Sequence, residues 1–305
     1  MTQLQYKGTG SANGGTGSRY WKDKTGYLGV LPFLLFSGVF LLYPTWNVVS
    51  GAFKDNYGKF STATFSEVFN SSIARHAFAN SLEISVKTAI FGAILGSLFA
   101  WAMSTGKPGG VFYKISVALS SVLAQFGGVM LTFAFLATFG FNGFVSTLAV
   151  KYLPNSFLAE SAWLYGKTGL TVLYTFFQIP LMVLVFLPTL ENLKPQWREA
   201  SDALGGKAYE YWLRIGIPVL TPSFVGGALL LFVNSFSAYA TAATLISLSD
   251  FLTPLEIATA LTSETGGSNP AEAKVLSLFM VIVVVIAMAL YALMRKRVSK
   301  WEQKR

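Results

Sequence analysis

A polar segment between two long apolar runs carries the residues whose types and spacing say most about function. A short stretch that contains small residues is followed by a glycine. Nine further residues separate this glycine from two isoleucines and a proline. In order these residues are Glu199, Ala200, Ser201, Gly205, Ile215, Ile217 and Pro218. Small side chains allow close approach to another protein, and the flanking charges fix the register. The pattern therefore predicts non-covalent docking, with no catalytic residue of its own.

Local signals predict that this segment forms a helix, a turn and a second helix. Pro195 suits the first turn of a helix, and Gly205-Gly206 suits its left-handed end, so we expect a helix over 196–204. A second helix is predicted over 208–215, ending before Pro218.

A second set of candidate residues consists of polar side chains in the middle of apolar runs. Such residues are costly in lipid unless they meet partners or a water-filled path, so they are the default candidates for a translocation path. The predicted path residues are Gln125, Gln178, Asn234, Ser237 and Tyr239. The alternative interpretation is hydrogen bonding between helices. None of these groups is charged, and the nearest acid is Glu83.

Several common kinds of site are missing from the sequence. Gly166-Lys167-Thr168 has the ending of a nucleotide-binding P-loop, but Ser161 stands where the first glycine is required. The chain has no cysteine, and its one histidine, His76, is not grouped with other metal-ligating residues in the sequence. We therefore expect no ATPase, no other enzyme activity, no metal site and no cofactor in this chain.

Composition points to an all-α integral membrane protein. Of the 305 residues, 53% are hydrophobic and 12% are charged. Six apolar runs are each near the roughly 20 residues that cross a bilayer, and only helices satisfy their own backbone in lipid. The predicted spans are 27–48, 82–103, 112–139, 170–190, 224–246 and 275–294.

Charge distribution predicts the orientation of these spans. Most of the 23 Lys and Arg residues lie on one side if both termini are cytoplasmic, and positive loops stay inside. The net charge of +9 is then explained by topology, and no nucleic-acid partner is expected. The predicted organisation is a disordered cytoplasmic tail (1–25), a first span with an outer loop (26–79), a five-span core (80–294) that contains the polar segment 191–222, and a basic cytoplasmic tail (295–305).

The polar segment resembles the cytoplasmic signature of permease subunits in bacterial binding-protein-dependent ABC importers of type I. That signature reads Glu-Ala-Ala, three residues, Gly, nine residues, Ile, any residue, Leu-Pro. Ser201 replaces the second alanine and Ile217 replaces the leucine, while Gly206 takes a place often held by alanine. The run 234–241 is more similar to the spermidine/putrescine, phosphonate and ferric-ion permeases than to the maltose type.

The resemblance implies a multi-pass protein of the bacterial inner membrane that imports a small polar or charged solute. Its partners would be two ATP-binding subunits that hold ATP and Mg, a second identical or homologous permease, an extracytoplasmic solute-binding protein and the lipid bilayer. In such families the signature helix enters a cleft on the ATPase and transmits its closure to the spans.

Three other functions are alternatives to this interpretation. The same machinery importing a sugar is the main alternative substrate class. An ion-coupled secondary transporter normally needs an embedded acid or ion site, and the mid-span groups here are neutral. A channel is disfavoured because no span has spaced arginines and no filter-like loop precedes the last span.

Overall fold

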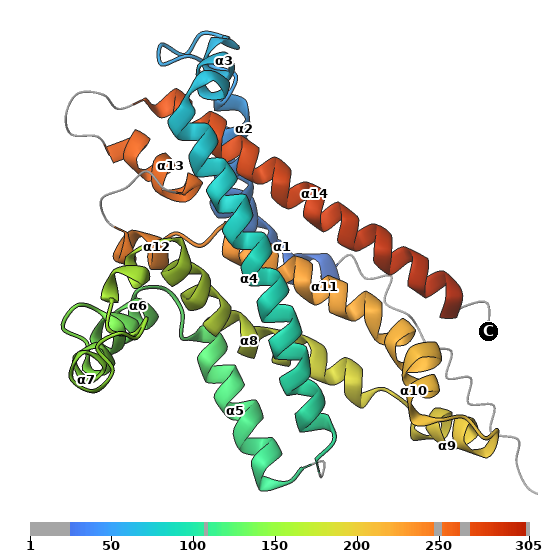
Figure 1. Ribbon diagram of the computed structural model, residues 1–305. Coiled ribbons are helices and arrows are strands. Elements are labelled where there is room, and N and C mark those ends of the chain that lie inside the picture. Colours follow the sequence, from blue (N-terminus) through green and yellow to red (C-terminus); the bar gives the residue numbers. More distant parts are fainter. Residues whose placement is uncertain (1–24, 107–108, 247–251, 263–268, 303–305) are drawn as a thin grey trace, which may run out of the picture. The chain divides into compact units, whose positions relative to one another are not determined.

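The structure is a computed structural model that describes residues 25–106, 109–246, 252–262 and 269–302 (Figure 1). Nearly all of the tail predicted over 1–25 lies outside the described residues. The chain divides into two compact units, residues 1–47 and 48–305, which are described separately.

The first unit is built from apolar helix. It contains α1 (Thr25–Ser37), the π-helical segment η1 (Gly38–Leu42) and the start of α2 (Tyr43–Gly51). Its large apolar side chains, such as Phe33 and Leu42, are exposed. A helix that is apolar on all sides is typical of a membrane span. The segment Val30–Gly51 is long and apolar enough to be one.

Three long helices form the centre of the second unit. They are α4 (Ser72–Ser104), α8 (Lys167–Glu191) and α11 (Ile217–Phe236), which pack on one another (Figure 1). The helices around them are α3 (Ala63–Asn70), α5 (Val111–Gln125), α6 (Gly128–Phe139), α7 (Phe144–Tyr152), α9 (Pro195–Ala203), α10 (Ala208–Tyr211), α12 (Ala240–Leu245), α13 (Thr253–Thr262) and α14 (Pro270–Glu302). Six helices of the described part are long and apolar enough to cross a membrane, so the expected all-α, six-span fold is confirmed.

Glycines bring α4 and α8 into close contact. A Cβ added at Gly92 would lie 2.8 Å from the Cβ of Gln178. One added at Gly96 would lie 2.5 Å from the Cβ of Met182 and 2.7 Å from the carbonyl oxygen of Ile179. Small residues four apart are a common device by which membrane helices approach each other. The α4–α8 contact therefore has no room for a side chain at Gly96.

Two of the predicted spans are wrong as continuous helices. The span 112–139 breaks after Gln125, where Gly128 adopts a positive φ of 67°, and resumes as α6. The span 224–246 breaks at residues 237–239, between α11 and α12. Hydropathy averages over a window and does not register a local change of backbone direction. Both breaks fall at residues predicted to line a path.

Several helices begin earlier than hydropathy predicts. The second span starts at Ser72 rather than at residue 82, because Ser71 caps it and its side-chain oxygen accepts a hydrogen bond from the backbone N–H of Ala74 at 3.3 Å. The part of the predicted outer loop before it contains α3, whose Phe69 packs against Phe279 of α14 with ring centroids 5.1 Å apart.

Candidate functional site

The predicted docking helix is present as α9, and its end has a defined geometry. Pro195 occupies the first turn, as expected. Gly205 has a φ of +76°. The backbone N–H of Gly206 donates to the carbonyl of Ser201 at 2.9 Å, and that of Gly205 donates to the carbonyl of Asp202 at 3.0 Å. This pair of bonds is a Schellman motif, which fixes the direction in which the chain leaves the helix.

The second helix of the segment does not end before Pro218, contrary to the prediction. It begins at α10, where the Glu210 carboxylate accepts a hydrogen bond from the backbone N–H of Lys207 at 2.9 Å. It continues through the π-helical segment η3 (Trp212–Gly216) into α11. Pro218 lies in the first turn of α11, where the π-helical register changes to α and its missing N–H is tolerated. Ala208–Phe236 is consequently one near-continuous span of 29 residues.

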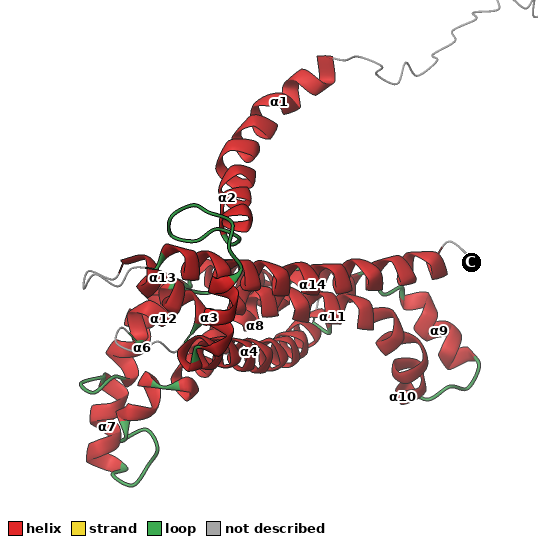
Figure 2. Ribbon diagram, turned by 90° about the horizontal axis from the view of Figure 1, so that it is seen from above, coloured by secondary structure: helices red, strands yellow, loops and turns green. Residues whose placement is uncertain are grey.

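Helix α9 and the helix that follows it enclose a cleft of about 530 Å³. Figure 2 shows α9 and α10 joined by a short loop at one end of α11. The cleft is lined by Trp197, Ala200, Ser201, Leu204, Gly205, Gly206, Glu210, Arg214, Ile215 and Val219. Of the predicted docking residues, Ala200, Ser201, Gly205 and Ile215 line it, whereas Glu199, Ile217 and Pro218 do not. We name this the coupling cleft.

The tip of the coupling cleft is apolar and open, while its base is anchored to the spans. Leu204 is 89% exposed although it is a large apolar residue. At the base, the ring of Trp212 packs edge-on against that of Trp101 at the end of α4, with centroids 6.4 Å apart. The hydroxyl of Tyr113 on α5 donates to the carboxylate of Glu191, at the end of α8 just before α9. These contacts connect the base of the cleft to α4, α5 and α8.

A second cavity, of about 240 Å³, lies where the two broken helices meet. Its lining residues are Ala124, Gln125, Gly127, Gly128, Phe177, Asn234, Ser237, Ala238, Tyr239, Ala240 and Thr241. Four of the five predicted path residues therefore line one cavity, with amide and hydroxyl groups and no carboxylate. We name it the break pocket. Its lining includes residues from α6, α12 and the C-terminal end of α11, whereas the residues of the coupling cleft lie at the other end of α11, where Figure 1 shows α9 and α10.

Hydrogen bonds hold the helix breaks in place. The buried Tyr174 of α8 donates its hydroxyl to the carbonyl of Ala238 at 2.9 Å, within the break that follows α11. Thr132 of α6 donates to the carbonyl of Thr241 at 3.4 Å, which links α6 to α12, and its shorter bond to the carbonyl of Gly128 at 3.0 Å lies within α6. Carbonyls freed by interrupting a membrane helix need such partners. Tyr174 and Thr132 were not predicted, since nothing in a single apolar run marks which hydroxyl faces a break.

The fifth predicted path residue, Gln178, lies outside the break pocket. It is fully buried between α4, α8 and α11. Its amide nitrogen donates to the hydroxyl of Thr88 at 3.2 Å, and the hydroxyls of Thr88 and Ser235 are 2.9 Å apart. The other amide atom, Oε1, has no hydrogen-bond partner in the described part of the chain. The structure thus places Gln178 in an interhelical network.

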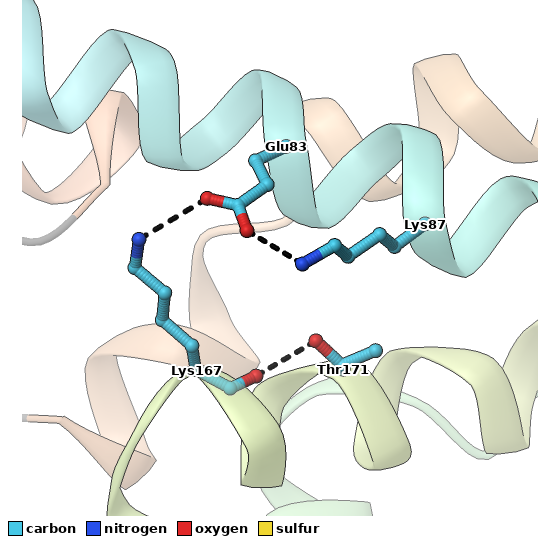
Figure 3. Close-up of polar contacts among 4 residues, drawn as sticks. All are labelled: Glu83, Lys87, Lys167 and Thr171. Atoms are coloured by element: carbon cyan, nitrogen blue, oxygen red, sulfur yellow. Dashed lines mark hydrogen bonds and ion pairs between the residues drawn. The ribbon is translucent and has the colours of Figure 1, made fainter.

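One charged cluster joins α4 to the start of α8 (Figure 3). The Glu83 carboxylate contacts the amine of Lys87 at 2.6 Å and that of Lys167 at 3.1 Å. All three side chains are about half exposed, so water screens both pairs and each contributes little to stability. The sequence identified Glu83 as the acid nearest the mid-span groups, but Lys167, 84 residues away, could not be matched to it. The cluster carries a net charge of +1.

The comparisons with known proteins agree with this geometry. No family model matches the chain. It is 28% identical over 211 residues to the sulfate transport system permease protein CysT of Escherichia coli (strain K12), covering 68% of this chain and 69% of that protein. It is 22% identical over 215 residues to the ferric transport system permease protein FbpB of Actinobacillus pleuropneumoniae, covering 69% of this chain and 30% of that longer protein.

The fold has a solved counterpart. A bacterial ABC transporter involved in the import of the acidic polysaccharide alginate contains a chain that matches with a TM-score of 0.70 and 15% identity. The match covers 90% of this chain and 95% of that one.

Fold and sequence relatives define one class of protein, the membrane-spanning permease subunit of a binding-protein-dependent ABC importer. The resemblance drawn from residues 199–218 is confirmed, and a ferric-type permease is among the relatives. The relatives are transport permeases rather than enzymes.

Proposed function

We propose that this chain forms the translocation path for a small inorganic oxyanion of the sulfate type. An extracytoplasmic solute-binding protein would deliver the anion. Two separate ATP-binding subunits that hold ATP and Mg would drive transport, and a second permease, identical or homologous, would complete the path. The single observation that carries the substrate class is a neutral, donor-rich break pocket in a chain related to a sulfate transport permease.

The lining of the break pocket favours an anion over a cation. Gln125, Asn234 and Tyr239 carry N–H or O–H donors, whereas the hydroxyl of Ser237 donates to the carbonyl of Val233 at 2.9 Å, and no carboxylate is among the lining residues. A ferric ion or a polyamine would call for acidic or other anionic oxygens, as hard cations do. The N-terminus of α6, where the backbone N–H groups point out of the helix, also opens at this pocket.

The coupling cleft supports the proposal that separate ATP-binding subunits drive transport. Its residues lie at the start of the near-continuous helix Ala208–Phe236, and the break pocket lies at the end of the same helix. At about 1.5 Å per residue, this helix spans roughly 40 Å. A displacement imposed at the cleft by an ATP-binding subunit would reach Asn234 and Ser237 through one rigid element. ATP-driven closure would then alternate the access of the pocket to the two sides.

Orientation follows from the same assignment. The cleft would face the cytoplasm, where ATP is available, and both termini would lie on that side, in agreement with the distribution of Lys and Arg. The charged cluster at Glu83 would then lie toward the outer ends of α4 and α8, where its net positive charge would attract an arriving anion.

The test is sulfate-dependent ATP hydrolysis and uptake by the complete complex in proteoliposomes. Asn234→Leu removes a donor from the break pocket, so uptake at a limiting sulfate concentration should fall about tenfold or more, because a hydrogen bond to a charged group is worth about 1.5–3 kcal/mol. Asn155→Leu removes the same amide from an exposed loop and is the matched control.

The outcomes separate the parts of the proposal. The proposal is supported if sulfate stimulates ATP hydrolysis and uptake, and if Asn234→Leu lowers uptake while Asn155→Leu does not. Stimulation by a sugar, a polyamine or ferric ion in place of sulfate would overturn the substrate class. Sulfate uptake without any ATP-binding subunit would overturn the ABC mechanism.

A further inference from the structure

An apolar groove of about 370 Å³ lies on the second unit between α3, α4 and α14, away from both the coupling cleft and the break pocket. Helices α4 and α14 begin close together and diverge toward their C-terminal ends (Figure 1), and the groove is lined by residues from the N-terminal half of each helix. Its lining residues are Val68, Phe69, Ala74, Arg75, Phe78, Ala79, Leu82, Leu276, Phe279, Ile282 and Val283. Arg75 is the one charged residue among them.

The walls of the groove are held by packing beneath it. Val68, Ala74 and Leu276 are buried and belong to one apolar cluster. Phe279 is fixed from two sides, with its ring 5.1 Å from that of Phe69 and 6.0 Å from that of Phe65. The groove is therefore a formed feature of the folded unit.

Arg75 gives the groove a polar end. It is exposed and sits near the start of α4, about two turns before Leu82. It forms no ion pair within 4.0 Å with any residue that the structure describes. A guanidinium binds a phosphate through two parallel hydrogen bonds, so Arg75 offers a phosphate site at one end of an apolar channel.

The surroundings and the size of the groove select the occupant. Both α4 and α14 are long and apolar enough to cross a membrane, and the groove-lining side chains of Phe69, Leu82 and Ile282 are exposed, as is typical of apolar side chains that face lipid. One turn of an α-helix, about 5.4 Å long and 10–12 Å wide, takes up at least as much space as the whole groove. The groove would therefore not enclose a helix of a partner, whereas a single acyl chain, which is thin and flexible, can lie along its length.

We propose that this groove is a binding site for an anionic phospholipid, with its phosphate on Arg75 and one acyl chain along Phe78, Leu82, Phe279 and Ile282. Arg75 is positively charged and no acidic residue lines the groove, so an anionic headgroup is favoured over a zwitterionic one. The site does not depend on which solute the permease carries.

The experiment uses the full chain in lipid nanodiscs that contain phosphatidylglycerol with a photoactivatable acyl chain. After illumination, mass spectrometry of peptides locates the attached lipid. We expect labelling on α4 and α14 within the groove. Arg75→Gln should lower it about tenfold, because the charge-assisted hydrogen bonds to the phosphate are lost. Arg75→Lys should retain part of it. Lys59→Gln, which removes an exposed cation outside the groove, should change nothing.

A second variant tests the acyl part of the site. Ala79→Phe fills the groove from an exposed position of α4 and should abolish labelling without unfolding the protein. Equal labelling of the parent and both groove variants would overturn the proposal. So would equal labelling by phosphatidylcholine, or a groove shielded from lipid by another protein helix.

Discussion

Replacing Gly205 with valine is expected to abolish solute-stimulated ATP hydrolysis and uptake while leaving membrane insertion intact. Gly205 has a φ of +76° and forms the end of α9. A non-glycine residue in this region costs about 1–2 kcal/mol, and a β-branched one is particularly disfavoured. The chain would leave the Schellman motif, and the cleft lined by Ala200, Ser201 and Ile215 would lose its shape.

The matched control for this change is Gly58→Val. Gly58 has a φ of +81° and, like Gly205, has no atom within 4 Å of an added Cβ. The backbone strain is therefore the same, but Gly58 lies in the turn between Lys54 and Phe60. Uptake should be retained in Gly58→Val. If both variants transported equally well, or lost transport equally, the role assigned to the end of α9 would be wrong.

The second large effect is expected from Gly96→Ala. The added methyl would lie 2.5 Å from the Cβ of Met182 and 2.7 Å from a backbone oxygen, so α4 and α8 must separate. Overpacking of this kind costs about 1–3 kcal/mol. Thermal unfolding in detergent, followed by tryptophan fluorescence, should show a melting temperature lower by several degrees, since about 1 kcal/mol corresponds to about 2–4 °C in larger domains.

Gly38→Ala is the control for packing at Gly96. Gly38 also lies in an apolar helical segment, but no atom lies within 4 Å of its added Cβ. The melting temperature of the Gly38→Ala variant should match that of the parent protein. An unchanged melting temperature in Gly96→Ala would mean that the α4–α8 contact is looser than the structure describes.

Sequence reasoning succeeds here where the signal is local. Pro195 and Gly205 each act on their own backbone, so the limits of α9 could be predicted within a residue. The existence of six spans follows from hydropathy alone, because lipid imposes one length on every span. The spacing of 199–218 identified the class of protein, since it places several residue types at fixed offsets.

Sequence reasoning fails where a residue's role depends on a distant partner. Pro218 looks like the end of a helix, but η3 and α11 continue through it. Gln125 and Gln178 look alike in sequence, yet one lines the break pocket and the other is buried beside Thr88. Gly92 and Gly96, four residues apart, are a local signal for close helix packing, but the sequence does not show which helix packs against them.

The most direct measurement is cross-linking from the tip of the coupling cleft. The chain has no cysteine, so Leu204→Cys introduces a single thiol at an 89% exposed position of the segment. Tyr57→Cys, at a 91% exposed position in the turn before α3, is the control. With a short thiol-to-amine cross-linker in the assembled complex, Leu204→Cys should join this chain to an ATP-binding subunit and Tyr57→Cys should not. Failure of Leu204→Cys to react with that subunit, or labelling of its thiol by an impermeant reagent from outside the cell, would contradict the coupling role.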